Sequence, residues 1–133
     1  MHISGKSGDE IINIDGTTES PEISLNAREG IIRFSGRSLP ENPKTFYSPI
    51  KEWLTEYTKN PAPSTNVSFM FDYFNTASSK LIMEIIDVIK TVEEKNSNLI
   101  IDWHYQEDDE DMLEAGEDFE AVTGVSFKYI SYP

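Results

Sequence analysis

The segment VSFMFDYF at residues 67–74 is followed by a helical pattern and a second apolar run, and this succession sets the expected fold. The segment is rich in aromatic residues and apolar on both alternating positions through its centre, which is typical of a central strand covered at least in part on both faces. Apolar residues then recur at helical spacing from residue 78 to about 95. Residues 99–105, LIIDWHY, predict another buried strand. Because strand–helix–strand connections cross over right-handedly, we expect these two strands to be parallel neighbours.

Upstream, two strand-like segments at residues 22–26 and 30–36 are joined by a loop of hairpin length that contains Gly30. They predict an antiparallel hairpin, with a short edge strand near residues 11–14 before it. The segment that follows, up to Tyr57, predicts an amphipathic helix with Asn42 as its N-cap and Pro43 at its first position.

Downstream, the acidic segment of residues 107–120 has apolar residues at helical spacing and predicts a third helix, which Gly124 ends. Residues 125–130 predict a last strand. We therefore expect an α/β fold: a mixed sheet of about five to six strands, with an N-terminal antiparallel hairpin and central parallel strands, packed with three helices. Residues 1–10 are expected to be a flexible lead-in, and residues 11–133 a single domain.

The chain has 133 residues, no cysteine and a formal net charge of -13. No apolar run approaches the roughly 20 residues that a membrane helix needs, and the N-terminus lacks a signal-peptide pattern, so we expect a cytoplasmic protein. Residues 67–133 carry fifteen acids against four bases, whereas residues 1–66 carry nine against seven. The negative electrostatic field of this excess of acids disfavours nucleic acid and membrane surfaces as partners and favours a protein with a basic surface.

No pattern for enzymatic chemistry stands out. The acidic run at residues 107–120 lacks the alternation of a calcium loop, and His2 and His104 have no partner at zinc-ligand spacing. Phosphate-binding, nucleophile-elbow and dinucleotide motifs are absent from the sequence, so we expect no metal, no cofactor and no enzymatic activity. The alternative is a hydrolase that uses carboxylates of the acidic helix, which would require an enclosed pocket.

Residues 72–80, DYFNTASSK, place three hydroxyls, Thr76, Ser78 and Ser79, where a central strand passes into a long helix. One interpretation is helix capping, in which Thr76 or Ser78 accepts a bond from a free backbone N–H of the first turn. The other is phosphorylation, because a phosphate at a helix N-terminus meets unpaired N–H groups and the positive end of the helix dipole. The residues themselves leave open which hydroxyl would be modified.

Four motifs in order give the chain a resemblance to the SiaC family of biofilm-regulation phosphoproteins, over roughly residues 14–130. They are residues 17–23 (TTESPEI), residues 38–54 from SLPEN to WL, residues 73–80 (YFNTASSK) and residues 103–105 (WHY). The resemblance implies a small regulatory domain with a STAS-like fold. It also implies that a kinase and an opposing phosphatase act on Thr76, with Ser78 and Ser79 as less favoured acceptors.

In that family the unphosphorylated protein binds a diguanylate cyclase, a GGDEF protein, and promotes cyclic-di-GMP synthesis, and phosphorylation breaks the complex. The resemblance thus implies a cyclase partner for this chain. The alternative is a STAS-like anti-sigma-factor antagonist in a partner-switching module. In either case we expect the partner to contact the segment around the switch, at Tyr73, Asn75, Thr76, Ser78, Ser79 and Lys80.

Overall fold

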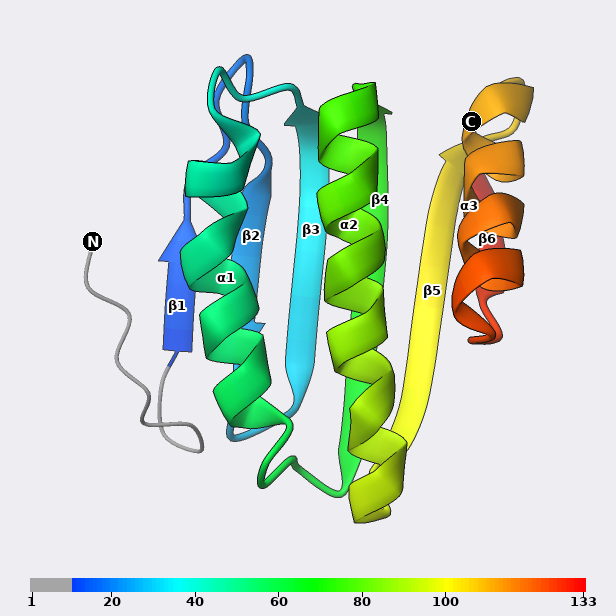
Figure 1. Ribbon diagram of the computed structural model, residues 1–133. Helices are drawn as coiled ribbons and strands as arrows, with labels where there is room; N and C mark the ends of the chain where they lie inside the picture. The colour runs from blue at the N-terminus through cyan, green and yellow to red at the C-terminus, as the bar shows by residue number, and fades with distance from the viewer. Residues whose placement is uncertain (1–10) are drawn as a thin grey trace.

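The computed structural model of the chain describes residues 11–133 (Figure 1). Within these residues, six strands form one sheet in the order of the sequence: β1 (Ile11–Ile14), β2 (Glu22–Asn26), β3 (Ile31–Ser38), β4 (Ser64–Phe74), β5 (Asn98–Gln106) and β6 (Lys128–Tyr132). Three α-helices connect the later strands: α1 (Pro43–Tyr57), α2 (Thr76–Ile89) and α3 (Glu110–Thr123), with a short 3-10 helix, η1 (Lys90–Lys95), after α2.

The sheet is mixed, as the sequence predicts. The first three strands pair antiparallel, and β3 to β6 pair parallel. Each parallel connection carries one helix, and right-handed crossovers between successive neighbours place all three helices on the same face of the sheet (Figure 1). No helix of the described part of the chain is long and apolar enough to cross a membrane.

The core lies between this one face and the helices. Alternate strand residues point toward the helix layer, and they stack aromatic rings such as Phe34 on Phe69, with centroids 5.2 Å apart. The helices contribute the facing side chains. Helix α1 is amphipathic, as predicted, and Asn42 caps it; its buried residues are Tyr47, Ile50, Trp53, Leu54 and Tyr57. The largest fully buried side chains are Trp53, Trp103, Tyr47, Tyr57, Phe34, Phe69 and Phe71.

The prediction that residues 67–74 are covered at least in part on both faces is wrong. Strand β4 alternates between buried and exposed residues along its middle, and Met70 is 37% exposed. On β5, Ile100 is 40% exposed on the same side. The physical reason is topological: three crossovers that advance in one direction along the sheet place every helix on one face and leave the other uncovered.

Three boundaries also differ from the prediction. Helix α2 begins at Thr76 rather than Ser78, and its last predicted turns are the 3-10 helix η1, which is followed by Asn96 with a φ of 63°. Strand β6 begins at Lys128, later than residue 125, although Val125 and Phe127 before it are buried. The predicted lead-in at residues 1–10 lies outside the described residues.

Helix α3 approaches the sheet closely at Gly116, whose backbone lies against the indole ring of Trp103. That ring is fully buried, and its Nε1 donates a hydrogen bond to the carbonyl oxygen of Met112 at 2.9 Å. A Cβ on residue 116 would lie 2.7 Å from the ring. The close approach therefore requires glycine.

We predict that Gly116→Ala destabilises the protein. Overpacking typically costs about 1 to 3 kcal/mol, against a helix-propensity gain of about 1 kcal/mol. We expect the cost to dominate because the ring is fully buried and stacked on Phe127. Denaturant unfolding should show a lower midpoint than wild type. The matched control is Glu117→Ala, an exposed change in the same turn, and an equal midpoint for the two variants would contradict the packing argument.

Candidate functional site

The segment that carries the three hydroxyls leaves β4 at the carboxyl edge of the parallel strands. Strand β3 ends beside it at Ser38, which pairs with Phe74. The β1–β2 loop reaches the same edge, where the carbonyl of Glu19 accepts a bond from the N–H of Leu39 at 2.8 Å. Thus three of the four sequence motifs meet at one edge, as expected for loops that follow parallel strands.

Asn75 is the N-cap of α2, which corrects the prediction that Thr76 or Ser78 caps the helix. Its side-chain oxygen accepts a bond from the N–H of Ser78 at 2.9 Å, and its own N–H donates to the carbonyl of Ser38 at 3.1 Å. An asparagine accepts such a bond as well as a hydroxyl does. The hydroxyl of Thr76 is therefore not needed for capping.

A buried hydrogen-bond chain holds this helix start to the rest of the fold. The Ser38 hydroxyl donates to the Ser78 hydroxyl at 3.0 Å, and the Tyr47 hydroxyl of α1 shares a hydrogen bond of 2.5 Å with the Ser38 hydroxyl. Ser38 and Ser78 have no exposed surface. Burial raises the pKa of Tyr47 to about 12, and the bond to Ser38 opposes that shift.

The predicted site residues fall into different environments. Thr76 is exposed at the first position of α2, Ser79 is half-buried, and Ser78 is buried in the hydrogen-bond chain. Of these three residues, Thr76 is thus the exposed one. Ser78 can neither meet a partner nor accept a phosphate without breaking its bond to Ser38.

The remaining predicted contact residues do not form a single patch. Tyr73 is 46% exposed and pairs with Arg37 on β3, whose guanidinium lies 5.5 Å from the ring centroid. That pair lies on the side of the sheet away from the helices, whereas Lys80 is exposed on α2. The segment therefore passes over the edge of the sheet, and Asn75, between these two residues, is half-buried.

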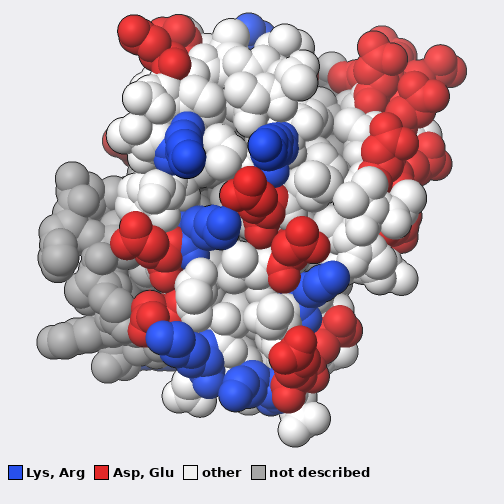
Figure 2. All heavy atoms as spheres, viewed as in Figure 1, with Lys and Arg blue, Asp and Glu red and all other residues white. Residues whose placement is uncertain are grey.

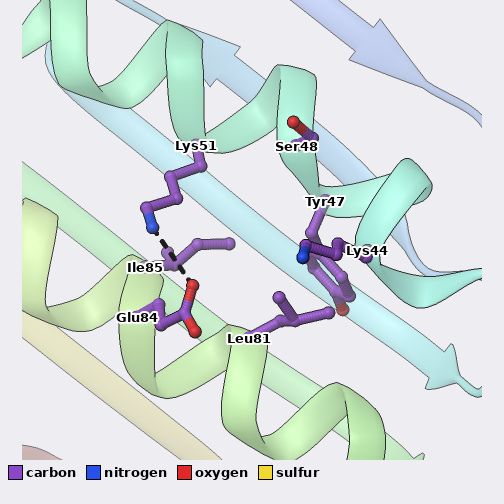
Figure 3. A pocket seen from close by; sticks show the side chains of 7 residues that line it. All are labelled: Lys44, Tyr47, Ser48, Lys51, Leu81, Glu84 and Ile85. Carbon is purple, nitrogen blue, oxygen red and sulfur yellow. Dashed lines mark hydrogen bonds and ion pairs between the residues drawn. The ribbon is translucent and has the colours of Figure 1, made fainter.

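A groove between α1 and α2 begins one turn along α2 from this segment. The hollow between the helices measures about 110 Å³, and Lys51 Nζ lies 3.1 Å from Glu84 Oε1. Figure 3 shows this ion pair, with Tyr47 and Leu81 at one end of the hollow. Both helices present bases as well as acids on this face, while α3 presents acids (Figure 2). The surface beside Thr76 thus carries less negative charge than α3.

The acidic segment at residues 107–120 does not form an enclosed site. Asp109 caps α3 by accepting from the N–H of Met112 at 3.0 Å, and Glu120 accepts from the Phe127 N–H at 2.8 Å and from the Tyr129 hydroxyl at 2.6 Å. Burial, with the bond to Glu120 and its charge, raises the pKa of Tyr129. The other seven acids of the segment are exposed, an arrangement that does not support the hydrolase alternative.

No cluster of three or more metal-ligating side chains occurs in residues 11–133. His104 is half-buried on the uncovered face of the sheet, away from residues 72–80, the Thr76 segment. Its neighbour Trp103 belongs to the core. The fourth motif is therefore split between the two faces of the sheet.

Ser38 and Tyr47 are residues that the sequence reasoning missed. In the sequence both residues stand only within the motif of residues 38–54, which assigns neither of them a role. One signal was available, because a hydroxyl at the end of a strand beside β4 is placed to meet the loop that follows β4. Which hydroxyls meet there depends on strand register, which the sequence does not show.

The sequence profile described as the SiaC family regulatory phosphoprotein matches residues 14–132. The chain belongs to the SiaC family. A curated relative, an uncharacterised protein of Pseudomonas aeruginosa strain UCBPP-PA14, is 25% identical over 108 residues, which cover 81% of this chain and 86% of the relative.

Solved SiaC structures share this fold. SiaC of P. aeruginosa superposes with a TM-score of 0.79 at 22% identity, covering 92% of this chain and 99% of the other. A crystal structure of the diguanylate cyclase SiaD in complex with its activator SiaC, also from P. aeruginosa, matches with a TM-score of 0.83 at 23% identity, covering 91% and 99%. The similarity confirms the six-stranded α/β architecture of this SiaC family member.

We predict that Ser38→Ala loosens the start of α2. The change leaves the hydroxyls of Tyr47 and Ser78 buried without the Ser38 hydroxyl that links them. A buried polar group that loses its hydrogen-bond partner typically lowers the free energy of unfolding by about 1 to 3 kcal/mol. Chemical denaturation should report this loss, and amide exchange at the first turn of α2 should become faster. Ser131→Ala, an exposed serine of β6, is the control. Unchanged exchange at Ser78 and Ser79 would show that the bridge does not hold the helix start.

We also predict that stability declines in alkali. Because the folded-state pKa of Tyr47, about 12, lies above its ordinary value of 10.0, its contribution is fully present below about pH 10 and is lost as pH rises toward about 12. Unfolding free energies measured across this window should fall, and Tyr47→Phe should show a shallower decline. Equal slopes for the two proteins would remove Tyr47 as a cause.

Proposed function

We propose that this chain is a phospho-switched, non-enzymatic regulator that binds and activates a diguanylate cyclase when Thr76 is unmodified and releases it when Thr76 is phosphorylated. Activation of the cyclase would raise cyclic-di-GMP synthesis and promote biofilm formation. A kinase and a phosphatase acting on Thr76 would set the state of the switch. The observation that carries the proposal is the environment of Thr76. This residue is exposed at the start of α2, it is not needed to cap the helix because Asn75 does so, and hydrogen bonds to Ser38 hold the helix start in place.

The helix start can accept a phosphate without unfolding. The N–H groups of Thr76 and Ala77 find no acceptor in the described part of the chain, and such free donors at a helix N-terminus favour an anion. Lys80 lies four residues along α2, on the same side of the helix as Thr76. A phosphate would therefore be tolerated locally, and its effect would fall on the partner.

The partner would dock over the Thr76 segment and the adjoining ends of α1 and α2. A phosphate adds a charge of about -1.5 to -2 and holds a shell of water tightly. In a contact that excludes water, this shell must be removed and the charge must find a partner, and both requirements cost free energy. In an interface built for the neutral hydroxyl, that cost weakens binding. The buried chain of Tyr47, Ser38 and Ser78 keeps the surface in place, so that the switch works by charge and not by refolding.

Of the two candidate targets, a cyclase has the better support. This chain belongs to the SiaC family, and the P. aeruginosa relative of the same fold is bound to the cyclase SiaD as its activator. The anti-sigma-factor alternative has only the STAS-like arrangement of a hydroxyl at a helix start. We therefore assign the cyclase as the target.

The test is to treat the protein with its cognate kinase and ATP and then measure binding to the cognate cyclase by titration calorimetry. Wild type should gain one phosphate, located on Thr76 by peptide mass spectrometry, and lose cyclase binding. Thr76→Ala should gain none and keep binding after the same treatment, because the small neutral side chain leaves the surface uncharged.

The matched control is Ser79→Ala, which removes a neighbouring half-buried hydroxyl and should behave as wild type. A phosphate found on Ser79 alone would reassign the acceptor. A protein fully phosphorylated on Thr76 that binds the cyclase as tightly as before would disprove the switch, and unmodified protein that never binds would disprove the partner.

A further inference from the structure

The uncovered face of the sheet is organised in rows that cross the strands. In the central row, Arg33 on β3 pairs with Ser68 on β4, which pairs with Asp102 on β5. In the next row, Ile31, Asn66 and Ile100 follow in the same order. Within the three central strands, each row thus has β4 in the middle, with one charged or apolar side chain on either side of it. The central row continues with Ser24 on β2 and Lys128 on β6.

The charges of this face balance, although the chain as a whole does not. The strand residues on this side include three bases, Arg33, Arg37 and Lys128, and three acids, Glu22, Asp72 and Asp102. The full chain carries 24 acids against 11 bases. A surface that must approach an identical surface needs this local neutrality, because a patch with the net charge of the chain would repel its copy.

The central charges have no partners within one copy. Among the described residues neither Arg33 nor Asp102 forms an ion pair, and the Oδ1 atom of Asp102 is buried without a hydrogen-bond donor. Both side chains line a hollow of about 450 Å³ on this face, together with Ile31, Asn66, Ser68 and His104. A buried carboxylate oxygen without a donor is costly, and a guanidinium supplies the donors that it lacks.

We propose that this face is a homodimer interface, in which a second copy of the chain packs sheet against sheet about a two-fold axis that runs along β4. Such an axis exchanges the positions of β3 and β5. Arg33 of one copy then faces Asp102 of the other, and Ile31 faces Ile100. Both the charged and the apolar residues of the two rows are thereby matched with their complements.

The geometry of sheet packing preserves this match. Two twisted sheets pack about 10 Å apart with their strands rotated by about 30°. Neighbouring strands lie only about 4.8 Å from the axis, so this rotation displaces the facing residues by about 2 Å, within reach of an arginine side chain. An axis across the strands would instead place Arg33 against Arg33, which the charges disfavour.

The test uses charge reversal and mixing. Arg33→Glu and Asp102→Arg each place like charges opposite one another in both contacts of the dimer, and each should raise the dimer dissociation constant at least about tenfold. Mixed together, the two variants should form a heterodimer, because the introduced glutamate then faces the introduced arginine, while the unchanged Asp102 of one variant faces the unchanged Arg33 of the other. Sedimentation velocity of the full chain, with circular dichroism to confirm folding, measures both effects.

Matched controls are Lys95→Glu and Asp108→Arg, which change the net charge equally at exposed positions away from the face and should leave the dimer intact. A wild-type chain that sediments as a monomer would overturn the proposal, as would a dimer that is indifferent to both reversals, or variants that do not associate on mixing. A monomer that loses cyclase binding on Arg33→Glu would assign the face to the cyclase instead.

Discussion

Parallel pairing of β3, β4, β5 and β6 determines where the helices and the strand ends lie. Each parallel step requires a crossover helix, and the constant handedness of these crossovers places α1, α2 and α3 on one face. The same pairing collects the carboxyl ends of the strands at one edge, where the Thr76 segment lies. It also leaves the second face of the sheet without a helix layer, so one topological rule produces both surfaces to which we assign roles.

Buried hydroxyls secure the two ends of the helix layer in different ways. At the amino end of β4, Tyr57, Thr65 and Ser97 form a chain that closes on the carbonyl of Ala62 at 2.7 Å, so every hydroxyl is used internally. At the carboxyl end, the chain that contains Ser38 stops at Ser78, two residues from an exposed hydroxyl. The first network stabilises the connection between α1 and β4, and the second supports the exposed surface around Thr76.

The sequence predicts the fold well because strand and helix periodicities differ and each crossover has one handedness. The hairpin, the cap at Asn42 and the parallel neighbours all follow from such local rules. The coverage of β4 was not predictable in this way, since Met70 and Ile100 are apolar yet face solvent on the bare side. The cap at Asn75 and the bridge through Ser38 were also missed, because several polar residues compete at one helix start and strand register decides among them.

Because Asn75 and Ser78 are both tied to Ser38, Thr76 belongs to a rigid helix start and not to a mobile loop. A protein kinase that binds its substrate as an extended peptide would have to break these bonds before it could reach the hydroxyl. An enzyme that modifies Thr76 in the native protein must therefore read the shape of the folded surface, including parts of α1 and β3 that are distant in sequence. Specificity would then reside in the tertiary structure, and a short peptide with the sequence of residues 72–80 would be a poor substrate.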